Sequence, residues 1–162
     1  MAELTVRLSE DADRARVEAF LSERGHRHAA RLGSLEDPLA HPALIALRGD
    51  ELAGVLTFVV DGDSCEVLTL NAGERRRGVG TALIEAVERE AAEAGCERLW
   101  LITTNDNVDA LRFYQRRGFR LVKLHVGAVD DSRARLKPEI PRVGEHGIDL
   151  RDELELEKLV GA

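Results

Sequence analysis

The sequence predicts an α+β fold with one core and one domain over residues 1–162. Stretches of alternating apolar and polar residues come first, and they are typical of an antiparallel meander. The chain then changes to strand, helix, strand, helix and strand, an order that requires crossover connections over one sheet. At 162 residues the chain has the size of a single domain, which buries roughly two thirds of its unfolded surface.

The first half of the chain supplies the predicted meander. Alternation predicts a strand over residues 4–8, and Ser9 before an acidic cluster predicts the start of a helix that runs to about residue 24. The irregular pattern that follows predicts a loop with some helix over residues 25–42. Three strands complete the series: 43–49 and 51–62, joined by the turn Gly49-Asp50, and 64–70 after the turn at 61–63.

Helical periodicity marks the second half of the chain. Apolar residues recur every four positions and predict an amphipathic helix that Gly95 ends: Val79, Leu83, Val87 and Ala91. The elements predicted after this helix are a strand over 98–104, a helix over 107–117 before Gly118, a strand over 119–126, a long loop over 127–150, and a strand or helix over 152–160.

Composition limits the classes of partner. The net charge of −7 and the pI near 5.3 argue against a nucleic-acid binder or an anionic-membrane binder, because phosphate-rich partners require a basic surface. No apolar run reaches the length of about 18 residues that spans a bilayer, and the first residues lack a signal pattern. We therefore expect a cytoplasmic protein. Cys65 and Cys96 are predicted to be buried free thiols, and no histidine or cysteine cluster completes a metal site.

Three arginines precede a Gly-Val-Gly step at the start of the amphipathic helix. The first N–H groups of a helix have no partner and favour an anion, and Gly78 and Gly80 allow a phosphate to approach them closely. A Walker loop would need GxxxxGK[ST], which the chain lacks, and a dinucleotide fingerprint would need glycine at Leu83. The alternative is that the arginines form a solvated turn.

Two motifs resemble those of one family. The string "RRRGVGTALI" resembles the [RQ]-x-x-G-x-[GA] motif of the GNAT superfamily of acetyltransferases, with Arg75, Gly78 and Gly80 in its three fixed places. The string "NVDALRFYQRRGF", residues 107–119, resembles the N-x-x-A-x-x-F-Y-x-x-x-G-F pattern found downstream in that family. The resemblance covers roughly residues 43–126, and the tail is similar to that of a bacterial subgroup.

The resemblance implies the GNAT fold, with acetyl-CoA (CoA) as cofactor. This fold has a mixed central sheet of about six to seven strands, helices on both faces, and a splay between strands 4 and 5 where the pantetheine arm enters beside a bulged strand. The pantetheine amides would pair with strand 64–70, and the pyrophosphate would sit at residues 75–81. The cofactor-binding residues implied in this way are Leu68, Thr69, Leu70, Arg75, Arg76, Arg77, Gly78, Val79, Gly80, Thr81, Asn107, Ala110 and Tyr114.

Acetyl transfer to an amine needs a base, a stabilised oxyanion and a proton for the departing thiolate. Tyr114 is the candidate for the last role, on one helical face with Asn107 and Ala110. Glu66 is the candidate base on the strand that would line the cleft, on one face with Leu68 and Leu70 unless the bulge intervenes. An ordered water is the alternative base, and packing is the alternative role of Tyr114.

The predicted activity is direct transfer of an acetyl group from acetyl-CoA to a primary amine of a small molecule or peptide. The alternative is an acyl-CoA-binding sensor or assembly subunit that has lost turnover. No metal, nucleic acid or membrane is expected, and a homodimer is possible. Basic residues of the 127–150 region either read an anionic acceptor or are solvated: Arg133, Arg135, Lys137 and Arg142. The acceptor itself does not follow from the sequence.

Overall fold

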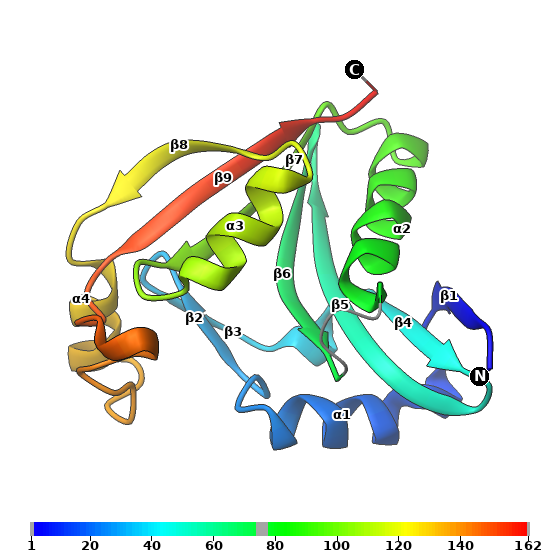
Figure 1. Cartoon of the computed structure of the whole chain (residues 1–162), viewed down its shortest axis with the longest axis horizontal. Coiled ribbons are helices and arrows are strands. Elements are labelled where there is room, and N and C mark those ends of the chain that lie inside the picture. Colours follow the sequence, from blue (N-terminus) through cyan, green and yellow to red (C-terminus); the bar gives the residue numbers. More distant parts are fainter. Residues whose placement is uncertain (1, 74–77, 162) are drawn as a thin grey trace. The chain divides into compact units, whose positions relative to one another are not determined.

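The computed structural model describes residues 2–73 and 78–161 (Figure 1). The chain divides into two units. The first comprises Met1–Ala29, Asp37–Leu99 and Val160–Ala162, and the second comprises Ala30–Glu36 and Trp100–Leu159.

The first unit contains the predicted antiparallel meander. Its strands are β1 (Leu4–Leu8), β4 (Ala43–Arg48), β5 (Glu51–Asp61) and β6 (Ser64–Ala72), which are neighbours in the order β1-β4-β5-β6. All three pairings are antiparallel. Gly49 adopts a φ of 60° between β4 and β5, a conformation that glycine reaches without steric cost, so the predicted turn is confirmed.

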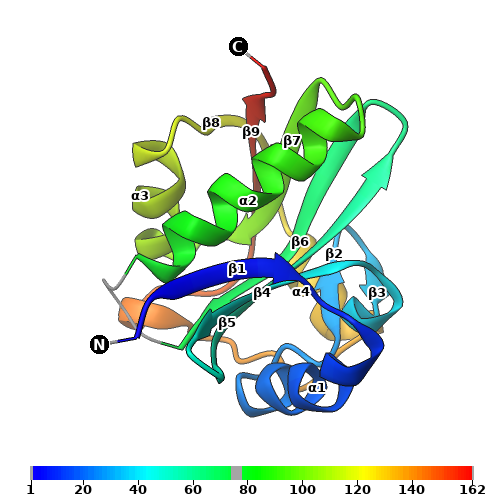
Figure 2. The same ribbon diagram turned by 90° about the vertical axis from the view of Figure 1, so that its right-hand side faces the viewer.

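Helices cover both faces of this meander, α1 (Arg14–Glu23) on one side and α2 (Val79–Glu93) on the other (Figure 2). Val55 of β5 packs with Phe20 and Leu21 of α1. Its neighbour Gly54 points to the opposite face, where an added Cβ would lie 2.6 Å from Cγ1 of Val79. The missing side chain of Gly54 therefore lets α2 lie directly on β5.

The start of the first helix differs from the prediction. Ser9 does not cap a helix, because its N–H donates to the carbonyl of Ala43 and so continues the β1 ladder. A short 3₁₀ turn, η1 (Asp11–Asp13), precedes α1 and has Glu10 as its N-cap. The buried Asp13 carboxylate accepts hydrogen bonds from Arg7, the Glu10 N–H and Arg16, and these bonds hold the pKa of Asp13 far below its usual range.

The second unit holds the remaining regular elements. They are β7 (Arg98–Thr104), which begins in the first unit, α3 (Val108–Arg116), β8 (Arg120–His125), α4 (Ala128–Arg135), the 3₁₀ turn η3 (Glu145–Gly147) and β9 (Glu153–Leu159). The strand order is β7-β9-β8, and β8 runs antiparallel to β9, beside which it lies in Figure 1. The final element is therefore a strand, as alternation predicts.

Two segments, one predicted as a loop and the other as a loop with some helix, contain regular structure. The 127–150 region begins with α4, and the 25–42 region contains the hairpin β2 (Ala29–Arg31) and β3 (Ser34–Glu36) and the 3₁₀ turn η2 (Pro38–Ala40). Leu32 and Gly33 form the hairpin turn with φ values of 49° and 75°. The Leu32 N–H donates to Oε1 of Glu153 at 2.9 Å, which anchors the hairpin within the second unit.

The α+β class and the mixed sheet of seven strands agree with the prediction. Both cysteines are buried and free, also as predicted. The splay between the fourth and fifth strands, the single domain, the homodimer and the cytoplasmic location stay predictions. Among residues 2–73 and 78–161, no helix is long and apolar enough to cross a membrane.

We predict that Gly54→Ala lowers the free energy of unfolding by about 1–3 kcal/mol, because the added methyl group meets Val79, the Asn71 carbonyl oxygen and Leu83 within 3.1 Å. Urea unfolding measures the loss. The matched variant is Gly54→Ala with Val79→Ala, which removes the nearest clash. The double variant should cost less than the sum of the two single variants, and strict additivity would contradict this account of the close approach.

Candidate functional site

The N-terminus of α2 supplies the first group of predicted residues. Gly78 is the N-cap and has a left-handed φ of 78°, which allows a sharp entry into the helix. The N–H of Ala82 donates to the Gly78 carbonyl at 3.0 Å, and the N–H groups of Val79 and Gly80 lie in the turn before it. They present the positive end of the helix to an anion. The predicted Arg75, Arg76 and Arg77 lie outside the described residues.

Strand β6 carries the bulge that the resemblance implies. Thr57 of β5 pairs with Thr69, and Phe58 pairs with Val67, so Leu68 is the additional residue on β6. A bulge adds one residue to the strand and so shifts the two-residue alternation. Side chains beyond it point to the opposite face from the one that uninterrupted alternation would give them. Leu68 and Leu70 are half-buried, whereas Thr69 is buried.

The bulge separates Glu66 from the face on which Leu70 lies. Val59 pairs with Glu66, and Val55 pairs with Asn71, so Glu66 and Asn71 both share the face that α1 covers at Val55. Leu70 pairs with Leu56 and lies on the α2 face. The expected common face of Glu66, Leu68 and Leu70 is therefore wrong, for the reason that the prediction itself allowed.

Buried polar side chains gather on the α1 face of β5 and β6. Glu66 is 4% exposed, and the hydroxyl oxygens of Thr57 and Thr69 lie 2.6 Å apart in a hydrogen bond. Asn71 is 7% exposed, and its side-chain Nδ2 has no hydrogen-bond partner within the described residues. Sequence reasoning missed Thr57 and Asn71. Their signal was a polar residue at an inward position of an otherwise apolar strand.

Helix α3 supplies the second group of predicted residues, in the second unit. Oδ1 of Asn107 accepts from the Ala110 N–H at 3.2 Å and caps the helix, so Nδ2 is the part of this side chain that can donate to a cofactor. Tyr114 is the buried residue of α3 and makes edge-to-face contacts with Phe113 and Phe119. Its burial raises the pKa of the Tyr114 phenol well above the ordinary value.

The predicted residues thus form two groups. Glu66, Leu68, Thr69, Leu70 and the start of α2 at 78–81 belong to the first unit, and Asn107, Ala110 and Tyr114 belong to the second.

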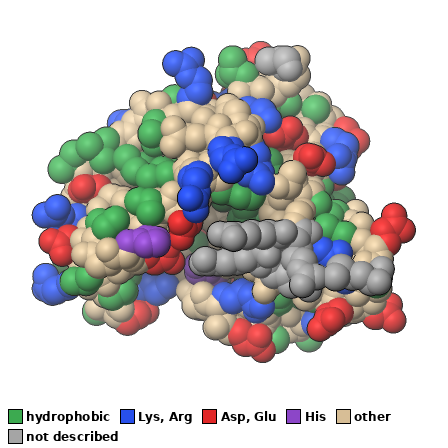
Figure 3. All heavy atoms as spheres, viewed as in Figure 1, with side chains coloured by type: hydrophobic (Ala, Val, Ile, Leu, Met, Phe, Trp, Pro, Cys, Tyr) green, Lys and Arg blue, Asp and Glu red, His purple; other side chains and the backbone are tan. Residues whose placement is uncertain are grey.

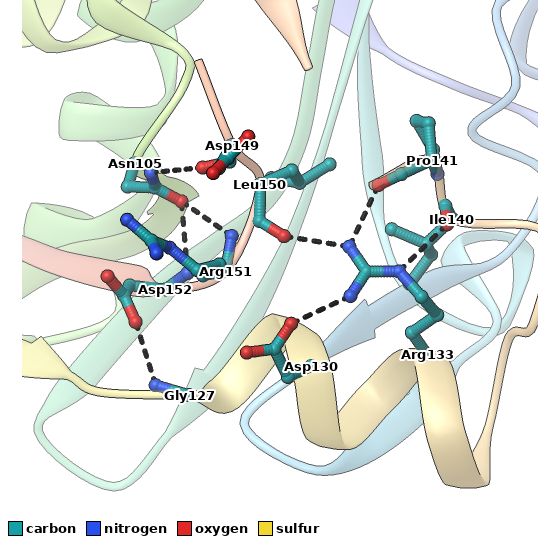
Figure 4. Close-up of polar contacts among 10 residues, drawn as sticks. All are labelled: Asn105, Gly127, Asp130, Arg133, Ile140, Pro141, Asp149, Leu150, Arg151 and Asp152. Carbon is teal, nitrogen blue, oxygen red and sulfur yellow. Dashed lines mark hydrogen bonds and ion pairs between the residues drawn. The ribbon is translucent and has the colours of Figure 1, made fainter. Parts of the chain in front are cut away.

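A guanidinium group orders the chain after α4 (Figure 4). Arg133 donates to the carbonyls of Ile140, Pro141 and Leu150 and pairs with Asp130, and its side chain is 11% exposed. Arg135 pairs with Asp131 over one helical turn. Arg133 therefore has a structural role instead of the suggested role of binding an anionic acceptor substrate, because carbonyl groups already use its donors.

The end of β7 holds the same region in place. The Asn105 side chain donates to the Asp149 carbonyl and accepts from the N–H groups of Arg151 and Asp152 (Figure 4). Asp106 accepts from the Glu145 N–H at 2.9 Å, and a Cβ on Gly144 would overlap the Asp106 carboxylate. The residues next to Asn107 in the chain are therefore structural.

Charge is mixed on the surface. Figure 3 shows acidic and basic side chains intermixed, with apolar side chains between them, over the coloured part of this face. The half-buried Asp109 and the exposed Glu145 and His146 have ligand atoms within 4.8 Å of one another, a grouping that sequence spacing does not reveal. His146 Nε2 lies 3.2 Å from Asp109 and so links η3 to α3. Exposed groups of this kind are common in proteins without a metal.

Comparison with known proteins gives one consistent family. A model of the acetyltransferase (GNAT) family matches residues 6–119. Protein YdhI of Bacillus subtilis is 46% identical over 110 residues, which cover 68% of this chain and 68% of that protein. A mycothiol acetyltransferase of Clavibacter sepedonicus is 37% identical over 97 residues, or 54% of this chain and 32% of that protein.

Solved structures share the fold. An IAA acetyltransferase from Bacillus cereus has a TM-score of 0.73 at 18% identity, over 97% of this chain and 99% of that one. A Bacillus subtilis acetyltransferase in complex with CoA has a TM-score of 0.68 at 21% identity, over 96% of this chain and 97% of that one. The CoA bound in that second structure agrees with the cofactor that the sequence predicts for this chain.

We predict that the Tyr114 phenol titrates well above the ordinary tyrosine pKa of about 10, because burial disfavours the phenolate. Tyr114 is the single tyrosine of the chain, so the ultraviolet absorbance of phenolate reports on this group alone. The same titration of the unfolded chain in guanidinium should return to about 10. If the titration midpoint of the folded protein equalled that of the unfolded chain, the burial of the Tyr114 phenol oxygen would be contradicted.

Proposed function

Because the chain belongs to the acetyltransferase (GNAT) family, we propose that it transfers the acetyl group of acetyl-CoA to a primary amine of a small molecule or peptide. The observation that carries this proposal is the bulge at Leu68 of β6, ten residues before Gly78, which caps the start of α2. A bulged strand beside a helix N-terminus offers amide hydrogen bonds to an extended chain and an anion site at its end.

The cofactor is proposed to bind along β6 and at α2. The amides of the pantetheine arm would pair with the backbone of Leu68, Thr69 and Leu70, as an added strand does. The pyrophosphate would accept from the N–H groups at 78–81, with Arg75, Arg76 and Arg77 supplying charge. Asn107 and Ala110 of α3 are further proposed contacts of the cofactor, through Nδ2 of Asn107 and the small alanine side chain.

The proposed reaction is attack of a neutral amine on the thioester carbonyl. The C–N bond forms, the carbonyl oxygen becomes an oxyanion held by a β6 N–H at or near Leu68, and the C–S bond then breaks to release the thiolate of CoA. The amine nitrogen loses its proton to a base, for which we propose Glu66, with an ordered water as the alternative. Glu66 is suited to this role because it is buried on the same strand as the bulge.

Tyr114 is proposed to act on the leaving thiolate. A thiol has a reference pKa of about 8.5, and the raised pKa of Tyr114 lies above it, so complete proton transfer from phenol to thiolate is uphill. A neutral phenol nevertheless donates a strong hydrogen bond to a thiolate. The raised pKa therefore favours stabilisation of the thiolate by a hydrogen bond, with the proton supplied by solvent afterwards.

Direct transfer in a ternary complex is preferred to a covalent acetyl relay. A relay needs a reactive thiolate that the cofactor can reach. Cys65 is buried, and burial, with smaller effects of Cys96 and Glu66, raises the pKa of its thiol to about 12. Cys96 is buried as well, and burial raises the pKa of its thiol. Both thiols are therefore unsuited to a relay.

We predict that Gly80→Val raises the Kd for acetyl-CoA by about tenfold or more, because a branched side chain blocks the approach of the pyrophosphate to the α2 N–H groups. Calorimetric titration measures the Kd. Glu85→Val is the matched control, since it places the same residue on the exposed side of α2, and its Kd should stay within about twofold of wild type. Equal affinities of a folded Gly80→Val variant and the control would refute the α2 site.

The transfer itself is tested by acetyl-CoA-dependent release of thiol with a panel of primary amines. Wild type should release thiol with at least one amine class. Tyr114→Phe should lower kcat by about tenfold or more while leaving acetyl-CoA affinity nearly unchanged, because the phenol is used in the transition state.

Glu66→Gln should lower kcat/KM, and the deficit should shrink at high pH as the free amine deprotonates in solution.

The outcomes separate the alternatives. Acetyl-CoA binding without thiol release on any amine would favour the sensor or assembly subunit over the enzyme. Release by Tyr114→Phe at the wild-type rate would remove Tyr114 from the mechanism. An unaffected Glu66→Gln variant would favour an ordered water as the base.

A further inference from the structure

Asn71 has an unsatisfied amide in the first unit. The residue is 7% exposed, and no described residue accepts a hydrogen bond from its Nδ2. A buried donor without an acceptor destabilises the folded protein relative to one that is paired. Such a group is rare in a folded protein and is explained when a ligand accepts its hydrogen bond. Asn71 is therefore a candidate contact for a bound molecule.

The face on which Asn71 lies indicates which molecule this is. Asn71 pairs with Val55, whose side chain packs on α1, whereas the neighbouring Gly54 faces Val79 of α2. The Asn71 side chain thus points away from the face on which α2 begins, where the pyrophosphate is proposed to sit. It shares its face with Glu66, the proposed base for the incoming amine. Asn71 is placed to contact the acceptor rather than the cofactor.

A cation lies beside the same end of β6. Arg24, at the end of α1, stacks on the Phe20 ring with its Cζ 3.5 Å from the ring centroid, and its Nη1 donates to the Phe20 carbonyl at 3.1 Å. Its Nη2 lies 3.2 Å from the position that a Cβ of Gly73 would occupy, two residues beyond Asn71. The stacking, the hydrogen bond and an ion pair of Nη1 with the exposed Glu23 at 3.5 Å hold the guanidinium, and the Arg24 side chain is still 32% exposed.

We propose that Asn71 and Arg24 bind a carboxylate of the acceptor, so that the enzyme acetylates amines that also carry a carboxylate group. This inference rests on the proposed acetyl transfer and names the class of its substrate. A carboxylate has two oxygens, one of which accepts from the Asn71 amide while the other meets the guanidinium. The Arg24 guanidinium is held by its contacts and the Asn71 side chain is confined by burial before the ligand binds, which lowers the entropic cost of binding.

The spacing along β6 sets the kind of acceptor. A strand rises about 3.3 Å per residue, so Asn71 lies about 7 Å beyond Thr69 on the same face, and Glu66 lies farther back beyond the bulge. The amine and the carboxylate of the acceptor must therefore be separated by several bonds. An ω-amino acid or the C-terminal carboxylate of a short peptide satisfies this requirement better than an α-amino acid.

The test uses linear amino acids of increasing length, from the α-amino acid glycine to the ω-amino acids γ-aminobutyrate and ε-aminocaproate, each paired with its neutral carboxamide. Thiol release with saturating acetyl-CoA gives kcat/KM for each member of a pair. Wild type should prefer the best carboxylate over its carboxamide by about tenfold or more, the size expected for a charge-assisted hydrogen bond. The preference should come mainly from a lower KM for the carboxylate member of each pair.

Two variants locate the preference. Asn71→Leu and Arg24→Gln should each bring the carboxylate-to-carboxamide ratio to within about threefold of one, without weakening acetyl-CoA binding. Arg14→Gln is the matched control, since it changes an arginine near the opposite end of α1 that donates to the Leu39 carbonyl, and it should keep the preference. Asn71→Leu should also keep or raise Tm, because an apolar side chain of similar size removes an unsatisfied donor.

Each outcome decides between the two proposals. Transfer by wild type without preference for the carboxylate members, or a preference that survives in both variants, would overturn the carboxylate subsite and leave the proposed transfer intact. Binding of acetyl-CoA without transfer to any member or to the wider amine panel would overturn the proposed function and this inference with it.

Discussion

The close approach of α2 to β5 at Gly54 is the constraint on which the first unit depends. A side chain at this position would collide with Val79 and Leu83, so glycine lets the helix rest on the strand. Because Val79 is the first residue of α2, the same contact fixes where the helix begins. An anion site made of backbone N–H groups has no side chains to adjust, so its position depends wholly on such packing.

The bulge at Leu68 gives the two faces of β6 different roles. Without it, the pleat would carry Glu66 to the face of Leu70 and hence toward α2. With it, Glu66, Thr69 and Asn71 all lie on the α1 face, while the start of α2 lies on the other. One inserted residue thereby separates the groups proposed for the acceptor from those proposed for the pyrophosphate. Such a division is useful to an enzyme that binds two substrates at once, because each substrate can then be recognised independently.

The sequence could predict what depends on local pattern. Alternation located the meander, four-residue periodicity located α2, and motif spacing singled out Tyr114. The hairpin turn at Leu32 was not predicted, because leucine rarely adopts a positive φ and because Glu153, which accepts the Leu32 N–H, is distant in sequence. Helix α4 escaped because it is short and polar and packs through few apolar residues. Asn71 was not predicted as a site residue, because an unsatisfied donor can be recognised only when its possible partners are placed in space.

Buried polar groups in this chain differ in how far the fold itself satisfies them, and Asn71 differs from the equally unsatisfied hydroxyl of Ser132 in that a cation lies beside its strand end. Asp13 is buried and the Arg133 side chain is 11% exposed, and the several partners of each tie together segments that would otherwise be loose. Asn71 is buried to a similar degree, yet its amide donor has no partner among the described residues. A fold selected for stability alone would place leucine there, since an apolar side chain loses nothing on burial. Retaining an amide at that cost is reasonable only if binding a ligand repays it, and the charge of Arg24 beside the same strand end indicates that this ligand is an anion.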